Sequence, residues 1–521
     1  MNPATAPTAR GGDAPAPVMN APFWDHQLDA FRLAASLPGY LLAHDMGCLC
    51  GKSATAIGLL EHDQAQRVLI LCPKNVVGIW PAQLNGPLDP PAPDQGFSPR
   101  HWSVWSGRVQ GSRGVKKNPS VTDRAVALMD AYTDALKLGH PFAAVVNYEA
   151  SFQGDMRELL LGTPWDAVIC DESHRLKLPS GKASRLATQV AQRVRGGGGR
   201  VLGLTGTPMP HSPLDIFAQM RILDGGQRLG TNYRAFCQRY GKAEEIRVAG
   251  GNVRTVYKDL RSDRVDQFTD TIGELMHTVS ADEVLDLPES TDRHVGFELS
   301  PTARRAYDEL EKYGIAEAGG GTLTASNAMV LVLRLAQATS GFGTDADTGR
   351  HVALDPSGTP DKARVLADLL EDVPTGEPVV VFCRFHADLD AVQAVAQQQG
   401  RRYGELSGRR RDGLTADSKM APDVDVLGTQ LKSGGVGINL TRARIGIYYS
   451  LDFALAEHQQ SRARLVRPGQ TRPVSFTYLL AQNTVDHAVL GALHKRRDVI
   501  DAVTAFLKSK QQPSTNGRNT P

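Results

Sequence analysis

The sequence has few cysteines, no long apolar run and almost no net charge. Six cysteines in 521 residues do not make a disulfide framework, which favours a reducing, cytoplasmic compartment. No stretch approaches the roughly 18 consecutive apolar residues of a membrane span, and the N-terminal residues lack the apolar core of a signal peptide. Lys+Arg number 58 and Asp+Glu 56, and this formal charge of +2 argues against a nucleic-acid binder that depends on basic tails.

The remaining composition is that of a globular protein. Hydrophobic residues make up 41% and charged residues 22%, which excludes wholesale disorder. At roughly 150 residues per domain, the length suggests about three to four domain-sized units. We expect disordered tails at 1–22, which is rich in Ala and Pro, and at 508–521, which is polar. The run RGGGGR at 195–200 is expected to be a flexible connector.

Short apolar runs alternate with helix-like stretches and fall into two clusters. The runs are 40–43, 68–72, 143–146, 167–170 and 201–205, then 379–383, 424–427, 445–449 and 476–480. Strands separated by helices in this way predict parallel sheets with crossover connections. We therefore expect an α/β fold with two lobes, at 23–225 and 297–507. The charged segment 226–296 lacks strong strand signals, which predicts a mainly helical insertion between them.

The first candidate site follows the first apolar run. A glycine-rich turn leads into Gly51, Lys52 and Ser53 at the start of a helix. Backbone N–H groups of such a turn and of a helix N-terminus bind phosphate oxygens. Lys52 would reach the β- and γ-phosphates, and the Ser53 hydroxyl would bind Mg²⁺. Taken alone, the pattern is also compatible with an ordinary glycine-rich turn between a strand and a helix.

Two further candidate sites lie at the ends of later strands. The run 167–170 ends in Asp171 and Glu172. In phosphate-loop enzymes a carboxylate at the end of a neighbouring strand holds Mg²⁺, which fits Asp171, while Glu172 would accept a proton from the attacking water or orient it. Thr205 and Thr207 end another strand, where small hydroxyls can sense the nucleotide, although Thr-Gly-Thr is also ordinary turn chemistry.

A fourth candidate site is the QxxxRxxR pattern formed by Gln460, Arg464 and Arg467. On a helix the two arginines, three residues apart, would share one face. An arginine finger from the second lobe would stabilise the charge on the γ-phosphate in the transition state. A solvated basic helix face is the alternative.

In order along the chain, these motifs resemble those of superfamily-two helicases, and in detail the Swi/Snf-like DNA-dependent ATPases. The resemblance covers residues 22–505 and is closest to short members from bacteria and phages. Further matching segments are PFWDHQLDAF around Gln27, LILCPKNVVGIW at 69–80, DESHRLK at 171–177, VVVFCRFHADLDAV at 379–392, GTQLKSGGVGINLT at 428–441 and PGQ at 468–470. EVLDLP at 283–288 matches more loosely, because His277, Thr278 and Val279 stand where basic residues are usual.

This resemblance implies two RecA-like lobes with ATP bound between them and double-stranded DNA across both. It assigns catalysis to Lys52, Asp171, Glu172, Arg464 and Arg467, and Mg²⁺ to Ser53 and Asp171. It assigns nucleotide binding to Gln27, Gly47, Gly51, Lys52, Ser53 and Gln460, and coupling to His174, Thr205 and Thr207. It assigns DNA contacts to Pro73, Lys74, Thr429, Gly434, Gly435, Gly437 and Asn439.

Such enzymes generally translocate on duplex DNA without separating its strands. The resemblance therefore implies an ATP- and Mg²⁺-dependent motor that contacts mainly DNA phosphates, with little sequence specificity and a strong dependence on salt. We expect a cytoplasmic monomer with no membrane partner.

The phosphate loop departs from the family pattern GxGK[ST]. Gly47 and Gly51 are separated by Cys48, Leu49 and Cys50, which is two residues too many. A tolerated bulge is one explanation. A residual or mis-joined intein is another, because inteins favour phosphate loops and commonly begin with Cys-Leu. A Cys-x-Cys metal site is disfavoured because no second Cys or His pair lies at zinc-ligand spacing.

Three other functions stay open at this point. One is a helicase that separates DNA strands or acts on RNA. Another is a non-hydrolysing DNA- or nucleotide-binding protein whose phosphate loop the insert has disabled, although the intact carboxylates and arginines argue against it. The third is the motor subunit of a restriction or repair assembly.

Overall fold

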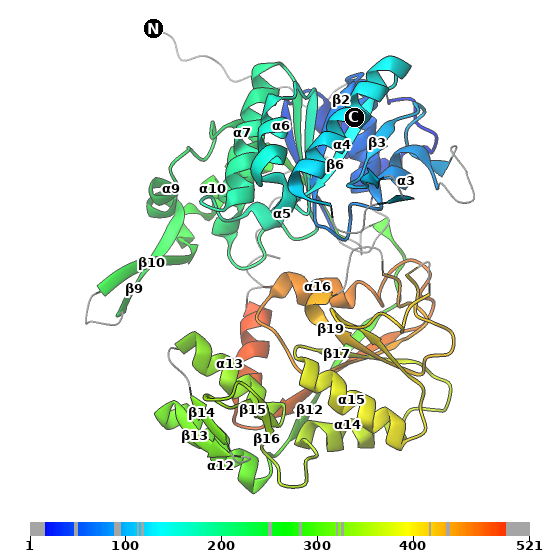
Figure 1. Cartoon of the computed structure of the whole chain (residues 1–521). Helices are drawn as coiled ribbons and strands as arrows, with labels where there is room; N and C mark the ends of the chain where they lie inside the picture. The colour runs from blue at the N-terminus through cyan, green and yellow to red at the C-terminus, as the bar shows by residue number, and fades with distance from the viewer. Residues whose placement is uncertain are drawn as a thin grey trace, which may run out of the picture. The chain divides into compact units, whose positions relative to one another are not determined.

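The structure is a computed structural model of the whole chain (Figure 1). It describes residues 16–45, 51–87, 95–111, 114–115, 119–247, 253–280, 284–318, 321–324, 328–415, 418–433, 438–495 and 497. Two compact units divide the chain, lobe 1 within Met1–Val284 and lobe 2 within Leu285–Asp498. Among the described residues, no helix combines the length and the apolarity needed to cross a bilayer.

Lobe 1 is built on a seven-stranded sheet in which all neighbouring strands are parallel, in the order β11-β1-β8-β7-β2-β6-β3. Its strands are β1 (Gly39–His44), β2 (Arg67–Cys72), β3 (Ser103–Trp105), β6 (Phe142–Asn147), β7 (Ala167–Asp171), β8 (Arg200–Leu204) and β11 (Met276–Val279). All the apolar runs predicted for this lobe form strands. Since the strands are parallel, the turns after β1, β7 and β8 lie on the same side of the sheet, at the carboxyl ends of the strands.

Helices cover both faces of this sheet. Against one face pack α1 (Asp25–Ala35), α2 (Lys52–His62) and α3 (Trp80–Asn85), and against the other α4 (Val121–Leu138), α6 (Gly154–Gly162), α7 (Lys182–Gly196) and α8 (Ile216–Asp224). Along β1, Leu42 joins the first core and Leu41 the second, as the alternation of side chains in a strand requires. Because both faces are buried, the strands read as continuous apolar runs in the sequence.

Lobe 2 is built on a six-stranded parallel sheet in the order β12-β21-β20-β17-β19-β18. Its strands are β12 (Ser290–Phe297), β17 (Val379–Cys383), β18 (Tyr403–Leu406), β19 (Val426–Gln430), β20 (Ile445–Tyr448) and β21 (Val474–Ala481). Helices α12 (Pro301–Tyr313), α13 (Ala328–Thr339), α14 (Asp361–Glu371) and α15 (His386–Gln398) contribute to its core, and α14 and α15 lie side by side (Figure 1). Two lobes of parallel sheet flanked by helices confirm the predicted fold class.

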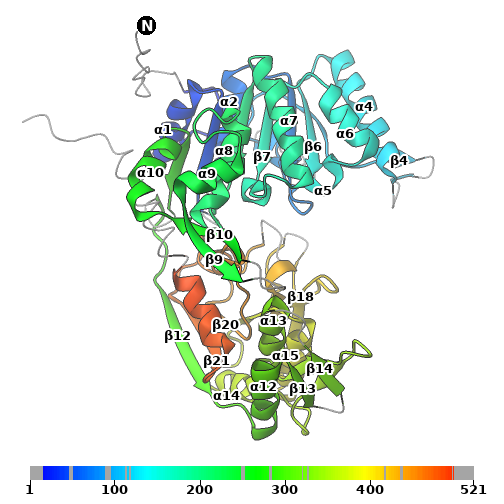
Figure 2. The same ribbon diagram turned by 90° about the vertical axis from the view of Figure 1, so that its left-hand side faces the viewer.

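The segment 226–296 is mixed rather than mainly helical, which corrects the prediction for it. It holds α9 (Tyr233–Tyr240), β9 (Gly241–Arg247), β10 (Val253–Leu260) and α10 (Val265–Gly273) before β11 and most of β12. β9 and β10 form an antiparallel hairpin that extends away from the sheet of lobe 1 (Figure 2). β11 has four residues and β12 exposes most of its side chains at a sheet edge, so neither gives an apolar run.

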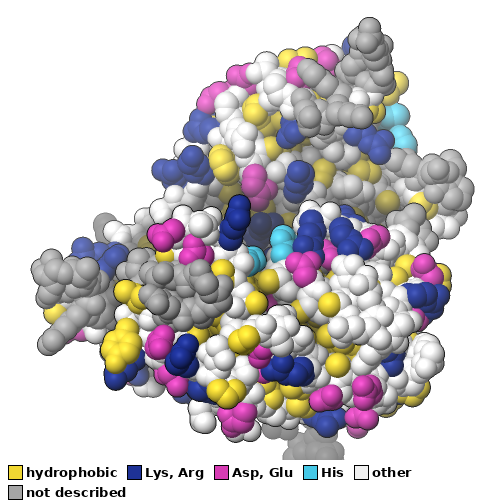
Figure 3. All heavy atoms as spheres, turned by 60° about the horizontal axis from the view of Figure 1, so that its bottom comes forward, with side chains coloured by type: hydrophobic (Ala, Val, Ile, Leu, Met, Phe, Trp, Pro, Cys, Tyr) yellow, Lys and Arg dark blue, Asp and Glu magenta, His cyan; other side chains and the backbone are white. Residues whose placement is uncertain are grey.

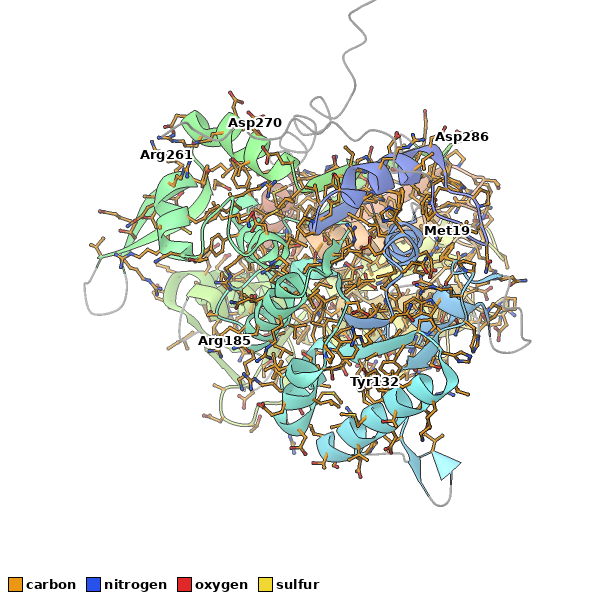
Figure 4. All side chains as sticks on the ribbon, turned by 90° about the horizontal axis from the view of Figure 1, so that it is seen from above. Met19, Tyr132, Arg185, Arg261, Asp270 and Asp286 are labelled. Carbon is orange, nitrogen blue, oxygen red and sulfur yellow. The ribbon has the colours of Figure 1, made fainter. Side chains whose placement is uncertain are left out.

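The part of this segment from α9 to β11 lies at one end of lobe 1, whereas β12 belongs to lobe 2. Figure 4 shows Arg261, which follows β10, and Asp270 of α10 in the same region, well apart from Tyr132 of α4. The order of strands gives the same picture, since β11 and β3 form opposite edges of the sheet. The candidate site of lobe 1 therefore lies between these ends, at the carboxyl ends of β1, β8 and β7.

Candidate active site

Lys52 is the first residue of α2, and Gly51 before it has a left-handed backbone with φ +67°. The N-terminus of α2 presents unpaired N–H groups and the positive end of its dipole, which suits an anion. Lys52 Nζ donates to the carbonyl oxygens of His44 at 2.7 Å and Asp45 at 3.1 Å, at the end of β1. The predicted Gly47 and the insert 48–50 lie outside the described residues.

Gln27 lies directly against the start of α2. Its side chain is buried, and its Oε1 accepts a hydrogen bond from the Trp24 N–H at 3.1 Å. A Cβ atom built on Gly51 would stand only 2.1 Å from Gln27 Nε2, so no larger residue fits at position 51 without displacing Gln27. The fold thus brings together the predicted adenine-reading residue and the glycine at the phosphate end.

Asp171 ends β7, and Glu172 follows it in a left-handed conformation with φ +51°. Such a backbone costs a non-glycine residue about 1–2 kcal/mol. Asp171 Oδ1 accepts from the Glu172 N–H at 2.9 Å, and Oδ2 accepts from Trp80 Nε1 at 3.0 Å. Oε2 of Glu172 is buried and accepts no hydrogen bond within the described part of the chain, although His174 Nδ1 lies 3.2 Å away.

The charges of these groups act on one another. Burial, followed by the negative charge of Glu172, raises the pKa of Asp171 to about 7, whereas the Trp80 hydrogen bond and the charge of Lys52 lower it. Burial lowers the pKa of Lys52, against the charges of Glu172, Asp171 and Asp45. Because burial and a like charge disfavour the ionised form of Asp171, a cation beside this carboxylate would stabilise it.

These residues fit a magnesium ion held mainly by substrate and water. No group of three or more His, Cys, Asp or Glu side chains able to hold a metal occurs in the part of the chain that the structure describes. Mg²⁺ usually binds through one or two protein groups together with phosphate oxygens and waters. Asp171 at the end of β7 and Ser53 at the second position of α2 suit that mode.

The turn after β8 connects to the turn after β7. His174 Nδ1 and Thr205 Oγ1 lie 3.0 Å apart, and Thr205 Oγ1 also accepts from the Thr207 N–H at 3.1 Å. Thr205 and Thr207 are buried, and Thr207 Oγ1 has no hydrogen-bond partner among the described residues. The three residues predicted to couple the nucleotide to a second site are therefore in one hydrogen-bonded chain.

In lobe 2, the two predicted arginines do not lie on one helix. α16 spans Leu455–Arg462 and carries Gln460, but Arg464 and Arg467 follow its end in a turn, which corrects the helical placement. Arg467 donates to the Ile438 carbonyl at 3.0 Å, and the Arg464 carbonyl accepts from the Leu440 N–H. Burial lowers the pKa of both arginines, and the value of about 10 for Arg464 leaves that group charged at neutral pH.

Sequence reasoning gave Arg462 no role, yet it anchors this end of α16. Its guanidinium contacts Asp292 of β12 at 2.5 Å and the Tyr478 hydroxyl at 3.0 Å, and lies 4.0 Å from the centre of the Phe476 ring. Residues 438–441 and 464–470 are also joined, because Gln470 Nε2 donates to the Thr441 carbonyl at 3.1 Å. The turn that carries Arg464 and Arg467 is thus fixed from two sides.

The residues predicted to contact DNA differ in exposure. Lys74 is exposed, whereas Pro73 and Thr429 are buried. Asn439 Oδ1 accepts from the N–H and hydroxyl of Thr441, at 2.9 and 2.8 Å, and so stabilises its own turn. Gly434, Gly435 and Gly437 lie outside the described residues.

Lys74 belongs to a small cluster of charges on lobe 1. Burial alone would raise the pKa of Glu149, but a hydrogen bond from Asn147 and the charges of Arg175 and Lys74 lower it. Arg175 lies 3.5 Å from Glu149.

On the face shown in Figure 3, Lys and Arg side chains lie among Asp and Glu, in keeping with the near-zero net charge.

Comparison with known proteins gives the family. A model described as SNF2-related domain matches residues 30–340, and one described as helicase conserved C-terminal domain matches residues 361–469. Putative protein p41 of Acyrthosiphon pisum secondary endosymbiont phage 1 is 25% identical over 392 residues, which are 72% of this chain and 80% of the phage protein.

A second relative is much longer than this chain. The SWI/SNF-related matrix-associated actin-dependent regulator of chromatin subfamily A-like protein 1 homolog of Caenorhabditis elegans is 25% identical over 475 residues, 89% of this chain but 59% of the relative. The Sulfolobus solfataricus SWI2/SNF2 ATPase core in complex with dsDNA covers 95% of this chain and 96% of its own, with 18% identity and a TM-score of 0.38, too low to place any residue. Because the first model alone matches more than half of the sequence, the chain belongs to the SNF2-related family of helicase-like, superfamily-two ATPases.

Proposed function

We propose that the chain is a motor that hydrolyses ATP when it binds double-stranded DNA and moves along the duplex. One observation carries the proposal. Lys52 begins α2, whereas Asp171 and Glu172 stand together at the end of β7, yet the charges of the three groups act on one another at the carboxyl ends of one parallel sheet. This is the arrangement that phosphoryl transfer needs, with a cation for the phosphates beside carboxylates for a metal ion and a water.

The roles in lobe 1 follow from the positions of the side chains. Lys52 would leave the carbonyl oxygens of His44 and Asp45 to bind the β- and γ-phosphates, while the N–H groups at the start of α2 bind phosphate oxygens. Ser53 and Asp171 would hold Mg²⁺, which when bound neutralises negative charge on the phosphates. Glu172, with a buried oxygen that lacks a hydrogen bond, would orient the attacking water and accept its proton.

The other nucleotide contacts are also proposals. Gln27, fixed by the Trp24 N–H, would read the adenine, and Gly47 and Gly51 would let the loop approach the phosphates. His174, Thr205 and Thr207 would report the state of the γ-phosphate through the hydrogen bonds that link them.

From lobe 2, Arg464 and Arg467 would stabilise the charge on the γ-phosphate in the transition state, and Gln460 would contact the nucleotide. Burial lowers the pKa of both arginines, but the value of about 10 for Arg464 keeps it charged at neutral pH. ATP would then bridge the lobes, and hydrolysis would release the bridge, giving two states of a clamp on DNA.

We infer that duplex DNA binds mainly through its phosphates. Lys74, exposed in the turn after β2, and Arg175 are the basic side chains of lobe 1 that support this. Gly434, Gly435, Gly437 and Asn439 are proposed to contribute from lobe 2, chiefly through backbone N–H groups. Pro73, in the turn after β2, and Thr429, in β19, are buried and would support the local backbone rather than present side chains to DNA.

Two further relatives of this chain are named as helicases. One relative is the DNA annealing helicase and endonuclease ZRANB3 of Homo sapiens, and another an uncharacterized ATP-dependent helicase of Mycoplasma pneumoniae. The match covers 35% of the length of ZRANB3 and 30% of the length of the Mycoplasma protein. The activity of either whole protein is therefore not assigned to this chain. A strand-separating helicase that acts on DNA or RNA therefore remains the second candidate.

Displacement of a third strand from triplex DNA separates these candidates. A duplex translocase should release the third strand in the presence of ATP, and should not unwind a partial duplex of the same length. Lys52→Ala should do neither. Unwinding of the partial duplex without release from the triplex would contradict the proposal and favour the helicase.

Location and oligomeric state are proposals that begin from the sequence. We expect a monomer in a reducing cytoplasm. The four cysteines that the structure describes, Cys72, Cys170, Cys237 and Cys383, are buried and free, which suits such a compartment.

A further inference from the structure

Trp80 connects two parts of lobe 1 that lie far apart in the sequence. It is the first residue of α3, and its ring is fully buried in the apolar core between α1–α3 and the sheet. Its indole N–H reaches Oδ2 of Asp171, 91 residues further along the chain, at 3.0 Å. Since Oδ1 already accepts from the Glu172 N–H, both oxygens of the carboxylate have fixed donors.

The turn between β2 and α3 joins Trp80 to the surface. Lys74 is exposed in this turn, and only six positions separate it from Trp80. Two consecutive turns fill that distance, with hydrogen bonds from Val76 N to the Pro73 carbonyl and from Ile79 N to the Val76 carbonyl, each at 2.9 Å. Because this segment is short and hydrogen-bonded, it cannot easily absorb a displacement of Lys74, and the displacement would reach Trp80.

A second aromatic residue holds the main chain of Asp171. Tyr148 begins α5 (Tyr148–Ser151) at the end of β6, is buried, and donates its hydroxyl hydrogen to the Asp171 carbonyl at 2.7 Å. β2 pairs with both β6 and β7, so the turns that follow β2 and β6 both reach the end of β7. The carboxylate is thus held through its side chain by one turn and through its backbone by the other.

We propose that Trp80 is a positioning residue that orients the Asp171 carboxylate and transmits DNA binding at the turn after β2 to the nucleotide site. This inference rests on the proposed function, in which Lys74 faces DNA and Asp171 holds Mg²⁺. A purely structural explanation is that a buried indole N–H needs any acceptor. The two explanations differ in what the loss of this one hydrogen bond changes.

Trp80→Phe removes the donor while keeping a buried aromatic ring. Trp165→Phe is the matched control, because the buried Trp165 in the same lobe donates its indole N–H to the Leu160 carbonyl at 2.9 Å, away from the site. Two quantities are measured for each variant. The first is the Mg²⁺ concentration that half-saturates binding of a fluorescent ADP analogue, and the second is kcat and KM for ATP with and without duplex DNA.

For Trp80→Phe, we expect the required Mg²⁺ concentration to rise about tenfold and the stimulation of kcat by DNA to fall about tenfold, the size expected for one hydrogen bond to a charged group. KM for ATP should stay within about twofold, and Trp165→Phe should match the wild type in every quantity within about twofold. If the two variants behave alike, or if Trp80→Phe changes only KM for ATP, the inference is wrong.

The inference can fail independently of the proposed function. If no nucleic acid stimulates the wild-type protein, the proposed function fails, while the Mg²⁺ dependence of ADP-analogue binding still decides whether Trp80 orients Asp171. If Trp80→Phe does not fold, Tyr148→Phe removes only a hydroxyl and should shift the Mg²⁺ requirement about threefold in the same direction. An unchanged requirement in that variant would overturn the inference.

Discussion

Replacing Arg200 with methionine tests how lobe 1 holds helices α1 and α2 in place. Arg200 begins β8 and is 7% exposed. Its Nη1 donates to the carbonyls of Ala34 at 2.7 Å and Leu37 at 2.6 Å, at the end of α1, and Nη2 donates to Asp63 at 2.9 Å, at the end of α2. One side chain therefore joins the two helices that carry Gln27 and Lys52.

The expected loss of stability follows from the partners that Arg200→Met leaves without a donor. Breaking a buried ion pair by removing one partner typically costs about 3–5 kcal/mol. The Asp63 side chain is 28% exposed, so water can replace part of what it loses. Methionine also keeps the aliphatic packing of the arginine stem. We therefore expect Arg200→Met to lower the free energy of unfolding of lobe 1 by about 2–4 kcal/mol.

Tryptophan fluorescence measures this change in lobe 1 alone. All five tryptophans of the chain precede residue 166, within lobe 1. Urea unfolding followed by this signal gives the free energy for each variant. The control is Arg185→Met, since Arg185 is exposed on α7 (Figure 4) and should cost less than about 0.5 kcal/mol. If Arg200→Met and Arg185→Met unfold at the same urea concentration, Arg200 does not hold the two helices.

Glu172→Gln should keep nucleotide binding within about twofold but lower steady-state hydrolysis by about 10²-fold or more, because an amide does not accept the proton of water; equal hydrolysis by variant and wild type would remove Glu172 from the mechanism. Burial lowers the pKa of His458 from 6.5 to about 3, so the unfolded chain binds the extra proton between these values. Lobe 2 should therefore lose up to about 1.4 kcal/mol of stability per pH unit below pH 6.5. Hydrogen exchange of lobe 2 amides measures this loss, and a slope that His458→Gln fails to reduce would argue against it. DNA-stimulated hydrolysis should fall steeply between about 50 and 200 mM salt, and stimulation that is insensitive to salt would contradict binding through phosphates.

The sequence predicts the buried parts of this fold well. The apolar runs 68–72 and 379–383 become β2 and β17, because a parallel strand covered on both faces needs apolar residues at every position. Strands without an apolar run escaped the prediction, and these include the buried β11 with its sequence MHTV. β12 lies at a sheet edge with mostly exposed side chains, so its sequence STDRHVGF carries no apolar pattern.

Side-chain contacts between distant segments are not visible in the sequence. Glycines in the run RGGGGR at 195–200 predicted a flexible connector, but α7 extends to Gly196 and β8 begins at Arg200, so only residues 197–199 connect the two elements. The last residue of the run, however, is the buried Arg200 that joins α1 and α2. Trp80 stood inside a recognised motif, but the hydrogen bond to Asp171 depends on how β2 and β7 pair.

For the site residues too, the sequence predicts local positions but not contacts between distant segments. The sequence placed Lys52, Asp171 and Glu172 at the ends of strands or the start of a helix, and the structure has them there. It placed Arg464 and Arg467 on a helix, since QxxxRxxR fits helical spacing, but α16 ends at Arg462. Contacts of Arg462 with Asp292 and Tyr478 fix that end, and these depend on strands of lobe 2 distant in the sequence.

Steady-state ATP hydrolysis by the purified chain tests the central claim most directly. It is measured without nucleic acid and with duplex DNA, single-stranded DNA or RNA, beside Lys52→Ala to exclude a contaminating ATPase. We predict hydrolysis that duplex DNA stimulates and that Lys52→Ala abolishes. If the wild type is silent, a variant lacking Leu49 and Cys50 restores the family spacing of the phosphate loop. Absence of hydrolysis in both proteins on every nucleic acid would contradict the account of a DNA-dependent motor.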